Sequence, residues 1–271
     1  MLFGIIVIPE LWAIVMSFLN YKPGENIYWV GLDNFRYILK DEFFLASIWK
    51  TFKFVFFSVV LQIFFGLSFA LLISNKFKLK KLWIAIILAP MAMSPAILGT
   101  TWKYLFNTDY GPINYILYKV NIEDIYWFVD PDIALLSLLI VYTWNHIPGV
   151  FILLYPAIIT IPKEYLESSK IDGANRWQNL IYIILPCIKG ALIITILYRT
   201  IISLRTFGEI IVLTKGGPLR ATEVMSIYLY KEGFVYFNWG NSASVGVIIL
   251  LVTLIATFPQ VKLFIRQLNN K

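Results

Sequence analysis

Long uninterrupted apolar stretches dominate the chain. Residues 54–74, 82–102 and 240–261 contain no charged side chain. A helix needs about 20 mostly apolar residues to cross the hydrocarbon core of a bilayer. The pattern therefore predicts six membrane-spanning helices, at residues 2–20, 52–74, 82–106, 133–159, 183–208 and 242–264.

The composition agrees with an all-α membrane protein. Hydrophobic residues make up 59% of the 271 positions and charged residues only 14%, with a mean hydropathy of +0.74. Soluble domains carry roughly 25% charged residues. With a single cysteine, Cys187, and a single histidine, the chain can form neither a disulfide framework nor a His/Cys metal cluster. An enzyme of the usual kinds is not expected.

The distribution of basic residues predicts the orientation. If Met1 lies inside, six spans place residues 75–81, 160–189 and 262–271 in the cytoplasm. These segments contain eleven basic and three acidic residues. Cytoplasmic loops carry an excess of Lys and Arg, and Lys76, Lys78, Lys80 and Lys81 form the densest run. We therefore expect both termini in the cytoplasm. The basic charge reflects this topology and does not indicate a nucleic-acid partner.

The start of the chain is expected to be an anchor. It has neither the basic segment nor the small-residue cleavage site of a signal peptide.

Polar side chains recur inside the predicted spans. A charge near the bilayer centre costs at least ~2.5 kcal/mol on insertion scales, so it usually faces protein or a wet cavity. We assign Gln62 to helix–helix packing. For residues 142–146, which precede Pro148, a transport pathway and simple packing both remain open.

Residues 161–186 form an unusual loop. The pattern predicts two short helices hinged at Asp172 and Gly173, with Pro162 in the first turn and Asp172 as N-cap of the second helix. Gly173 permits a sharp turn. Leu166, Ile171, Ala174 and Trp177 can share one apolar face. Such a pair can lie on a membrane or dock into a partner's groove.

The spacing within this loop resembles a known family. The pattern E-x5-G-x9-I-x-L-P is met by Glu167, Gly173, Ile183, Leu185 and Pro186. It is similar to the "EAA" loop of binding-protein-dependent ABC importer permeases, with Ser168 and Ser169 in place of the two alanines. Within the loop, I-D-G-A-N-x-W-Q resembles the carbohydrate-uptake branch of this family, which includes the maltose-type and glycerol-phosphate-type permeases. Residues 30–35, 207–218 and 226–230 also resemble this branch, so the likeness extends over essentially the whole chain.

The resemblance implies a type-1 ABC permease fold with a cytoplasmic coupling helix. Residues 1–50 would hold an N-terminally short first span and an external segment. Residues 51–271 would form the permease core, which includes the coupling loop at 160–182. The residues implied to contact an ATPase are Glu164, Glu167, Ser168, Ser169, Asp172, Gly173 and Ala174.

The resemblance also implies the partners. Such a chain is a non-catalytic, multi-pass subunit of a bacterial or archaeal inner membrane that binds no cofactor. It forms half of a pathway for a sugar or oligosaccharide. The partners are a second homologous permease, an ATPase dimer that uses ATP and Mg²⁺, an extracytoplasmic solute-binding protein, and membrane lipid.

Pathway residues follow from the same resemblance. Aligned through Trp144 and Pro148, and through the Thr-x-Gly-Gly-Pro segment, they are Tyr142, Asn145, His146, Gly149, Arg199, Ile202, Ser203 and Thr206. The last four have the spacing i, i+3, i+4, i+7 and are expected on one stripe of a helix. For Arg199, contact with substrate and a bond to a facing helix both remain open. The sugar is not identified.

Other classes remain as alternatives. A permease of the same family could move glycerol phosphate or an acidic oligosaccharide. A secondary transporter or channel would need an ion-coupling site and usually repeated halves, and no inverted repeat is evident. An intramembrane enzyme would need a nucleophile–base or metal pair that one His and one Cys cannot supply.

Overall fold

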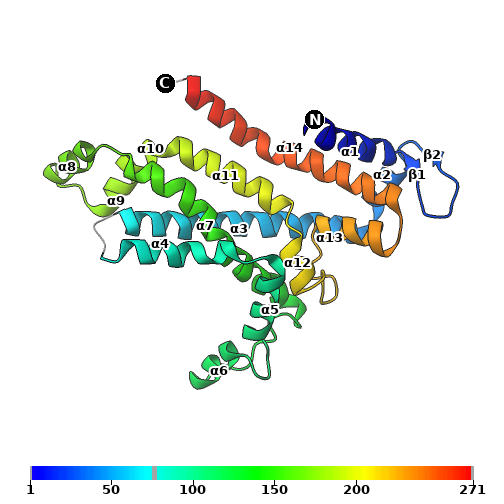
Figure 1. Ribbon diagram of the computed structural model, residues 1–271, viewed down its shortest axis with the longest axis horizontal. Coiled ribbons are helices and arrows are strands. Elements are labelled where there is room, and N and C mark those ends of the chain that lie inside the picture. Colours follow the sequence, from blue (N-terminus) through cyan, green and yellow to red (C-terminus); the bar gives the residue numbers. More distant parts are fainter. Residues whose placement is uncertain (1, 75–77, 270–271) are drawn as a thin grey trace. The chain divides into compact units, whose positions relative to one another are not determined.

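The computed structural model describes residues 2–74 and 78–269 as a helical protein (Figure 1). Among the described residues, three helices are long and apolar enough to cross a membrane without interruption: α3 (Glu42–Ser74), α7 (Pro131–Ile159) and α14 (Trp239–Asn269). Prolines 148 and 156 lie inside α7 without ending it. Within a membrane, neighbouring groups can satisfy the backbone that a proline frees.

Two further predicted spans are broken helices. Helix α4 (Lys80–Leu88) continues into the 3₁₀ turn η1 (Ala89–Ala92), and α5 (Pro95–Leu105) begins after Ser94. The span predicted at 82–106 is therefore interrupted, because the residue before a proline is disfavoured in helical conformation. The segment Arg176–Cys187 and α11 (Lys189–Leu204) are bent by 76° at Ile188.

The first predicted span is shorter than expected. Helix α1 covers Leu2–Met16, 15 residues with Pro9 inside. By length and composition, the described residues thus contain three uninterrupted spans, or up to five when each broken pair counts as one.

The remaining elements are short. They are β1 (Leu19–Asn20) and β2 (Tyr28–Trp29), which pair antiparallel, α2 (Asp33–Lys40), α6 (Pro112–Lys119), α8 (Lys163–Ile171), α9 (Arg176–Asn179), the π-helix η2 (Leu180–Ile184), α10 (Leu185–Cys187), α12 (Gly208–Leu213), α13 (Met225–Tyr230) and the π-helix η3 (Lys231–Val235).

The chain forms two compact units. Unit 1 contains residues 1–55, 95–138 and 204–256, and unit 2 contains residues 56–94, 139–203 and 257–271. Helices α3, α7 and α14 contribute residues to both units.

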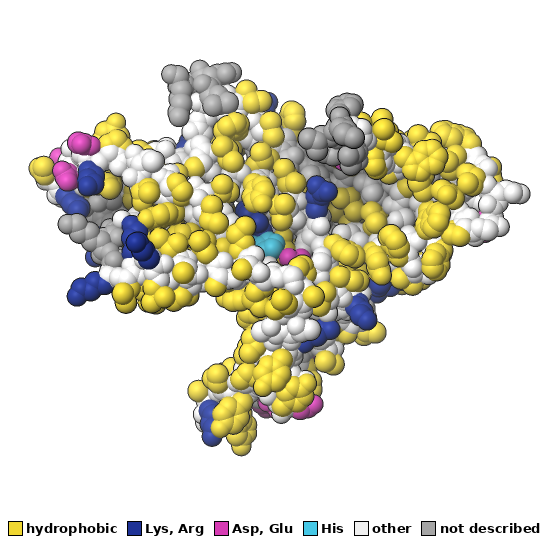
Figure 2. Space-filling model, viewed as in Figure 1, with side chains coloured by type: hydrophobic (Ala, Val, Ile, Leu, Met, Phe, Trp, Pro, Cys, Tyr) yellow, Lys and Arg dark blue, Asp and Glu magenta, His cyan; other side chains and the backbone are white. Residues whose placement is uncertain are grey.

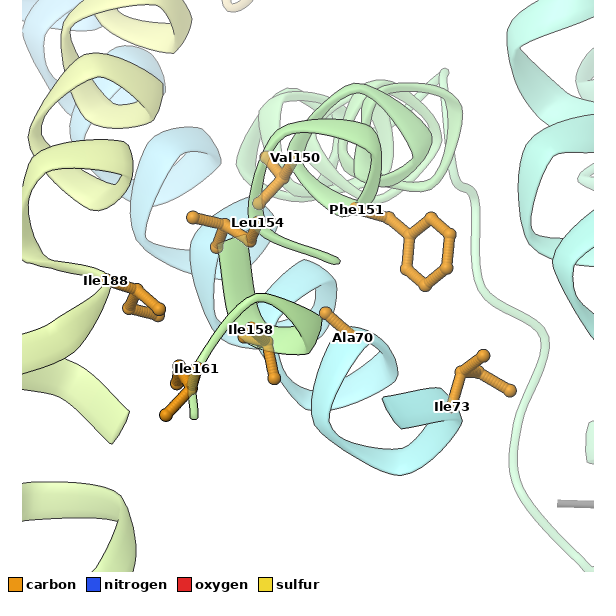
Figure 3. Packing of buried hydrophobic residues seen from close by; sticks show 8 residues of the cluster. All are labelled: Ala70, Ile73, Val150, Phe151, Leu154, Ile158, Ile161 and Ile188. Atoms are coloured by element: carbon orange, nitrogen blue, oxygen red, sulfur yellow. The ribbon is translucent and has the colours of Figure 1, made fainter. Parts of the chain in front are cut away.

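The core of unit 2 is built where α3 packs on α7. Its buried side chains are Ala70, Ile73, Val150, Phe151, Leu154, Ile158, Ile161 and Ile188 (Figure 3). A Cβ on Gly66 would lie 2.5 Å from the Val150 Cγ1, so only glycine allows this approach. Small residues that let backbones approach are the usual device of helix packing in membranes.

The core of unit 1 joins α2 and the start of α3 to α13 and α14, through Ile38, Phe44, Met225, Tyr228 and Val245. In the same unit α5 packs on α12. A Cβ on Gly99 would lie 2.2 Å from the Val212 Cγ1.

Large apolar side chains cover much of the molecule's surface, as Figure 2 shows for one face. Among them, Phe56, Phe64, Ile255 and Phe258 are each more than 60% exposed. An apolar surface of this extent marks contact with a partner or a membrane. The expected basic run is described only at Lys78, Lys80 and Lys81, because Lys76 lies outside the described residues.

Candidate functional site

The predicted hinge at Gly173 is a helix C-terminus of the Schellman type. The Ala174 N–H donates to the Ser169 carbonyl at 2.9 Å, and the Gly173 N–H donates to the Lys170 carbonyl at 3.2 Å. Gly173 has φ +78, and no atom lies within 4 Å of where its Cβ would be. This pair of bonds satisfies carbonyls that the end of α8 leaves without helical partners.

The predicted N-cap was wrong by three residues. Asp172 is the C-cap of α8, with φ −71 and ψ 0. Asn175 caps α9: its side chain accepts from the Gln178 N–H at 2.9 Å, and the Gln178 side chain accepts from the Asn175 N–H at 2.8 Å. The Schellman turn uses Gly173 and Ala174 to close α8, so the second helix can only begin after them.

Most residues of the predicted coupling set lie on the surface of this loop. Glu164, Glu167, Ser168, Asp172 and Gly173 are exposed, and Ala174 is half-buried. Ser169 differs: it is buried, and its hydroxyl donates to the Leu166 carbonyl at 3.0 Å.

The apolar face predicted for the helix pair is partly open, because Leu166 and Ala174 are half-buried whereas the other two residues are exposed. Ile171 and Trp177 are 87% and 72% exposed. The loop therefore presents carboxylates together with uncovered apolar side chains.

Several predicted pathway residues meet inside unit 2. The Tyr142 hydroxyl of α7 lies 3.3 Å from the Ser203 Oγ of α11, and the Ser58 Oγ of α3 lies 3.4 Å from the same atom. Tyr142, Ser203 and Ser58 are all buried. Three membrane helices thus bring their hydroxyl groups to one point.

Arg199 lies one helical turn away from this point. Its Nε donates to the Gln62 Oε1 at 2.7 Å, and both side chains are buried. The guanidinium also lies near Gly149, where a Cβ would make an ordinary van der Waals contact with the Arg199 Nη1 at 3.7 Å. The prediction that Gln62 joins helices is confirmed, and the bond shows that Arg199 also contacts a facing helix.

The remaining residues of this set are less uniform. The centroids of the His146 and Tyr142 rings lie 4.1 Å apart. Ile202 is half-buried on α11. Asn145 is 8% exposed, and its side-chain oxygen has no hydrogen-bond donor among the described residues. Buried amide groups are normally hydrogen-bonded, so this oxygen is an exception within the set.

The expected stripe does not extend to Thr206. Helix α11 ends at Leu204, so Thr206 lies in the turn before α12 and belongs to unit 1. There its hydroxyl lies 3.4 Å from the Glu209 Oε2, and its carbonyl accepts from the Ser226 hydroxyl. These bonds hold the turn out of helical conformation, and only Arg199, Ile202 and Ser203 share the helix.

Unit 1 contains a cluster of charged residues that was not predicted from the sequence. Glu223 is buried and forms ion pairs with Arg220, at 3.3 Å, and with Lys231. The Tyr228 hydroxyl donates to the Asp41 Oδ2 at 2.7 Å. These residues help to line a pocket of about 390 Å³. No local motif marks them, because the pairs join segments as many as 187 positions apart.

Glu232 belongs to the same pocket. Burial raises the pKa of its carboxyl, although a hydrogen bond from the Asn241 amide partly opposes the shift. Burial disfavours the charged form of an acid.

The comparison with protein families agrees with this geometry. The family described as "Binding-protein-dependent transport system inner membrane component" matches residues 62–268. The chain belongs to this family. The match includes the loop with Gly173 and the polar residues of α7 and α11.

Individual relatives extend the likeness to nearly the whole chain. The trehalose/maltose transport system permease protein MalF of Thermococcus litoralis is 34% identical, over 92% of this chain and 81% of the relative. The sulfoquinovosyl glycerol transport system permease protein SmoG of Agrobacterium fabrum is 25% identical, over 93% of this chain and 83% of the relative.

Among solved structures, a bacterial ABC transporter that imports the acidic polysaccharide alginate has a chain that superposes with a TM-score of 0.86. It is 23% identical, and the likeness covers 97% of this chain and 91% of that one. The protein therefore has the ABC permease fold that the sequence predicted.

Proposed function

We propose that this chain is one permease subunit of an ATP-driven importer of sugars or oligosaccharides. It forms one half of the pathway, and a second homologous permease forms the other half. A solute-binding protein delivers the sugar from outside, and an ATPase dimer hydrolyses ATP with Mg²⁺ in the cytoplasm. The permease itself binds no cofactor and catalyses no reaction.

The observation that carries this proposal is the buried polar centre on α3, α7 and α11. Hydroxyl, amide, imidazole and guanidinium groups offer both donors and acceptors beside the ring of Tyr142. Sugar hydroxyls need this mixture, and polar side chains at membrane depth mark a transport pathway by default. The trehalose/maltose permease is a relative with a matching substrate class.

The exposed loop at Gly173 supports the coupling role. A helix pair with carboxylates and open apolar side chains fits a groove on a partner. If the ATPase grooves move when ATP binds, α8 and α9 transmit the motion to the spans as rigid bodies.

The decisive test is uptake by the complete importer in proteoliposomes. The permease is assembled with a second permease, an ATPase and a solute-binding protein from the same organism, and labelled trehalose or maltose is offered with ATP at the ATPase side. ATP-dependent accumulation supports the proposal. Uptake driven by an ion gradient without ATP would favour a secondary transporter and refute it.

The pathway is tested with a matched pair of substitutions on α11. Ser203→Ala removes the hydroxyl that meets Tyr142 and Ser58, whereas Thr195→Ala removes a buried hydroxyl that donates to Ala191 of its own helix at 2.7 Å. We expect a raised KM for Ser203→Ala alone. Equal uptake by both variants would exclude this centre from the pathway.

The substrate class has one alternative with a specific basis. Arg199 at the polar centre could serve glycerol phosphate or an acidic oligosaccharide, and the alginate importer shares the fold. Competition by glycerol phosphate or by oligoalginate in the uptake assay separates these from a neutral sugar.

The proposed topology has six spans with both termini in the cytoplasm. A single cysteine at Lys78 or at Leu219, in a background that lacks Cys187, tests it with an impermeant reagent in intact cells. Leu219 is 90% exposed, whereas a side chain at Gly216 would meet the Ile227 Cγ2 at 2.8 Å. Labelling at 219 but not at 78 is expected, and the reverse would invert the topology.

A further inference from the structure

The segment between α5 and α7 forms a tyrosine-lined pocket that none of the roles above uses. The pocket has a volume of about 410 Å³. The lining includes Thr108, Asp109, Tyr110, Tyr115, Tyr118 and Asp124. This volume lies within the range of small-molecule sites.

Hydrogen bonds and ring stacking fix the conformation of this segment. The Asn114 side chain accepts from the Trp127 Nε1 at 2.7 Å and donates to the Ile125 carbonyl at 3.1 Å. Trp127 in turn stacks on Phe106, with ring centroids 4.4 Å apart. A Cβ on Gly111 would lie 2.2 Å from the Asn107 carbonyl oxygen, so the turn at this position requires glycine. The tyrosines therefore project from a segment whose backbone is fixed by these contacts.

The tyrosine rings are turned outward rather than packed in a core. Tyr110, Tyr115 and Tyr118 are 66%, 62% and 69% exposed. A tyrosine presents an apolar ring face and a hydroxyl that can donate or accept. Two carboxylates, Asp109 and Asp124, lie in the same lining, and the Lys119 ammonium is engaged over the Tyr115 ring at 5.2 Å.

Topology places this pocket outside the cell if the coupling loop lies inside. A single uninterrupted span, α7, separates the segment from α8. The pocket is therefore on the side from which an importer receives its solute.

We infer that this pocket is an external binding site for neutral saccharides, formed by the faces of Tyr115 and Tyr118 with Asp109 and Asp124 as acceptors for sugar hydroxyls. The assignment rests on the proposed sugar-import function. Ring faces stack on the C–H faces of a pyranose, and carboxylates accept from its hydroxyls. The two carboxylates also disfavour uronic acids, because like charges repel. The site thus selects neutral sugars ahead of the transmembrane pathway.

The test uses the assembled permease–ATPase complex in nanodiscs, without the binding protein. Saturation-transfer NMR measures binding of maltotriose and trehalose, with trigalacturonate as the anionic probe. We expect binding of at least one neutral sugar and none of trigalacturonate. The double variant Tyr115→Ala, Tyr118→Ala removes two aromatic contacts and should weaken binding by roughly 2- to 10-fold for each of them.

Tyr126→Ala is the matched control. Tyr126 is 54% exposed in the same segment but does not line the pocket, and binding should be unchanged. Asp124→Asn should permit some binding of trigalacturonate. Circular dichroism and size-exclusion profiles establish that each variant is folded.

Two results would overturn the inference. One is the absence of neutral-sugar binding in the native complex. The other is equal binding by the double variant and Tyr126→Ala, which would make the tyrosines anchors at the membrane interface. Either result combined with normal ATP-driven sugar uptake leaves the proposed function intact, whereas failure of uptake in the native importer refutes that function by itself.

Discussion

Replacing Gly173 by alanine tests whether the shape of the loop after α8 is required for coupling. Gly173 has φ +78, and the space around its missing Cβ is open. The substitution therefore creates no clash within the chain and acts only through backbone strain. The left-handed conformation costs an L-residue roughly 1–2 kcal/mol, which corresponds to about a 5- to 30-fold change in an equilibrium.

We expect this strain to appear as weaker ATPase binding. If the ATPase binds only the native Schellman turn, Gly173→Ala lowers its affinity by up to that factor. Gly173→Asn should lower the affinity for the ATPase less than Gly173→Ala does, because asparagine tolerates this conformation at helix C-termini. Binding is measured by biolayer interferometry with the permease in nanodiscs, and uptake is measured in parallel.

Gly24 provides the control. It has φ +83 in the β1–β2 loop of unit 1, and it too has no atom within 4 Å of its missing Cβ. Gly24→Ala imposes a similar strain away from the loop and should leave ATPase binding unchanged. If Gly173→Ala binds the ATPase as tightly as Gly24→Ala does, the loop geometry is not what the ATPase recognises.

Three further predictions concern charge, packing and pH. Glu167→Lys reverses an exposed charge on α8 and should abolish ATPase pull-down with normal membrane insertion; retained pull-down and uptake would contradict the coupling role. Gln62→Leu removes the acceptor 2.7 Å from the Arg199 Nε and should destabilise the permease by about 1–3 kcal/mol in thermal unfolding, whereas an unchanged Tm would show that the bond adds nothing. Burial raises the pKa of Glu232 above 4.5, so its charged form destabilises the fold at neutral pH. Its contribution to stability should improve as the pH falls through the raised pKa, and Glu232→Gln should flatten the dependence of Tm on pH above the ordinary pKa of a glutamate. Identical profiles of Tm against pH for the native protein and Glu232→Gln would contradict this prediction.

Local signals in the loop at residues 161–186 were sufficient to predict part of the candidate site. Gly173 was predicted at a turn from its residue type alone, and its positive φ confirms this. The N-cap was misplaced because Asp172 and Asn175 are both good caps. The pattern N-x-x-Q at Asn175 and Gln178 is a capping-box signal in the sequence and could have decided between them.

Helix ends inside apolar stretches were harder to predict. Leu204 is followed by Arg205, Thr206 and Phe207, and none of these residues marks a helix end as strongly as proline does. The end of α11 is stabilised by bonds at Thr206 to Glu209 and Ser226, the latter 20 positions away. Such a boundary is set by contacts that periodicity does not contain.

The sequence by itself determined the membrane class, the main apolar helices and the two-helix form of the loop at residues 161–186. These depend on transfer of apolar side chains into lipid and on backbone preferences of single residues, which are local properties. Only the tertiary structure decided which polar groups meet. Gln62 and Arg199 lie 137 positions apart, and Tyr142 and Ser203 lie 61 apart. A buried polar group must find a partner, but which partner it finds depends on how the helices pack, and packing is a property of the whole chain.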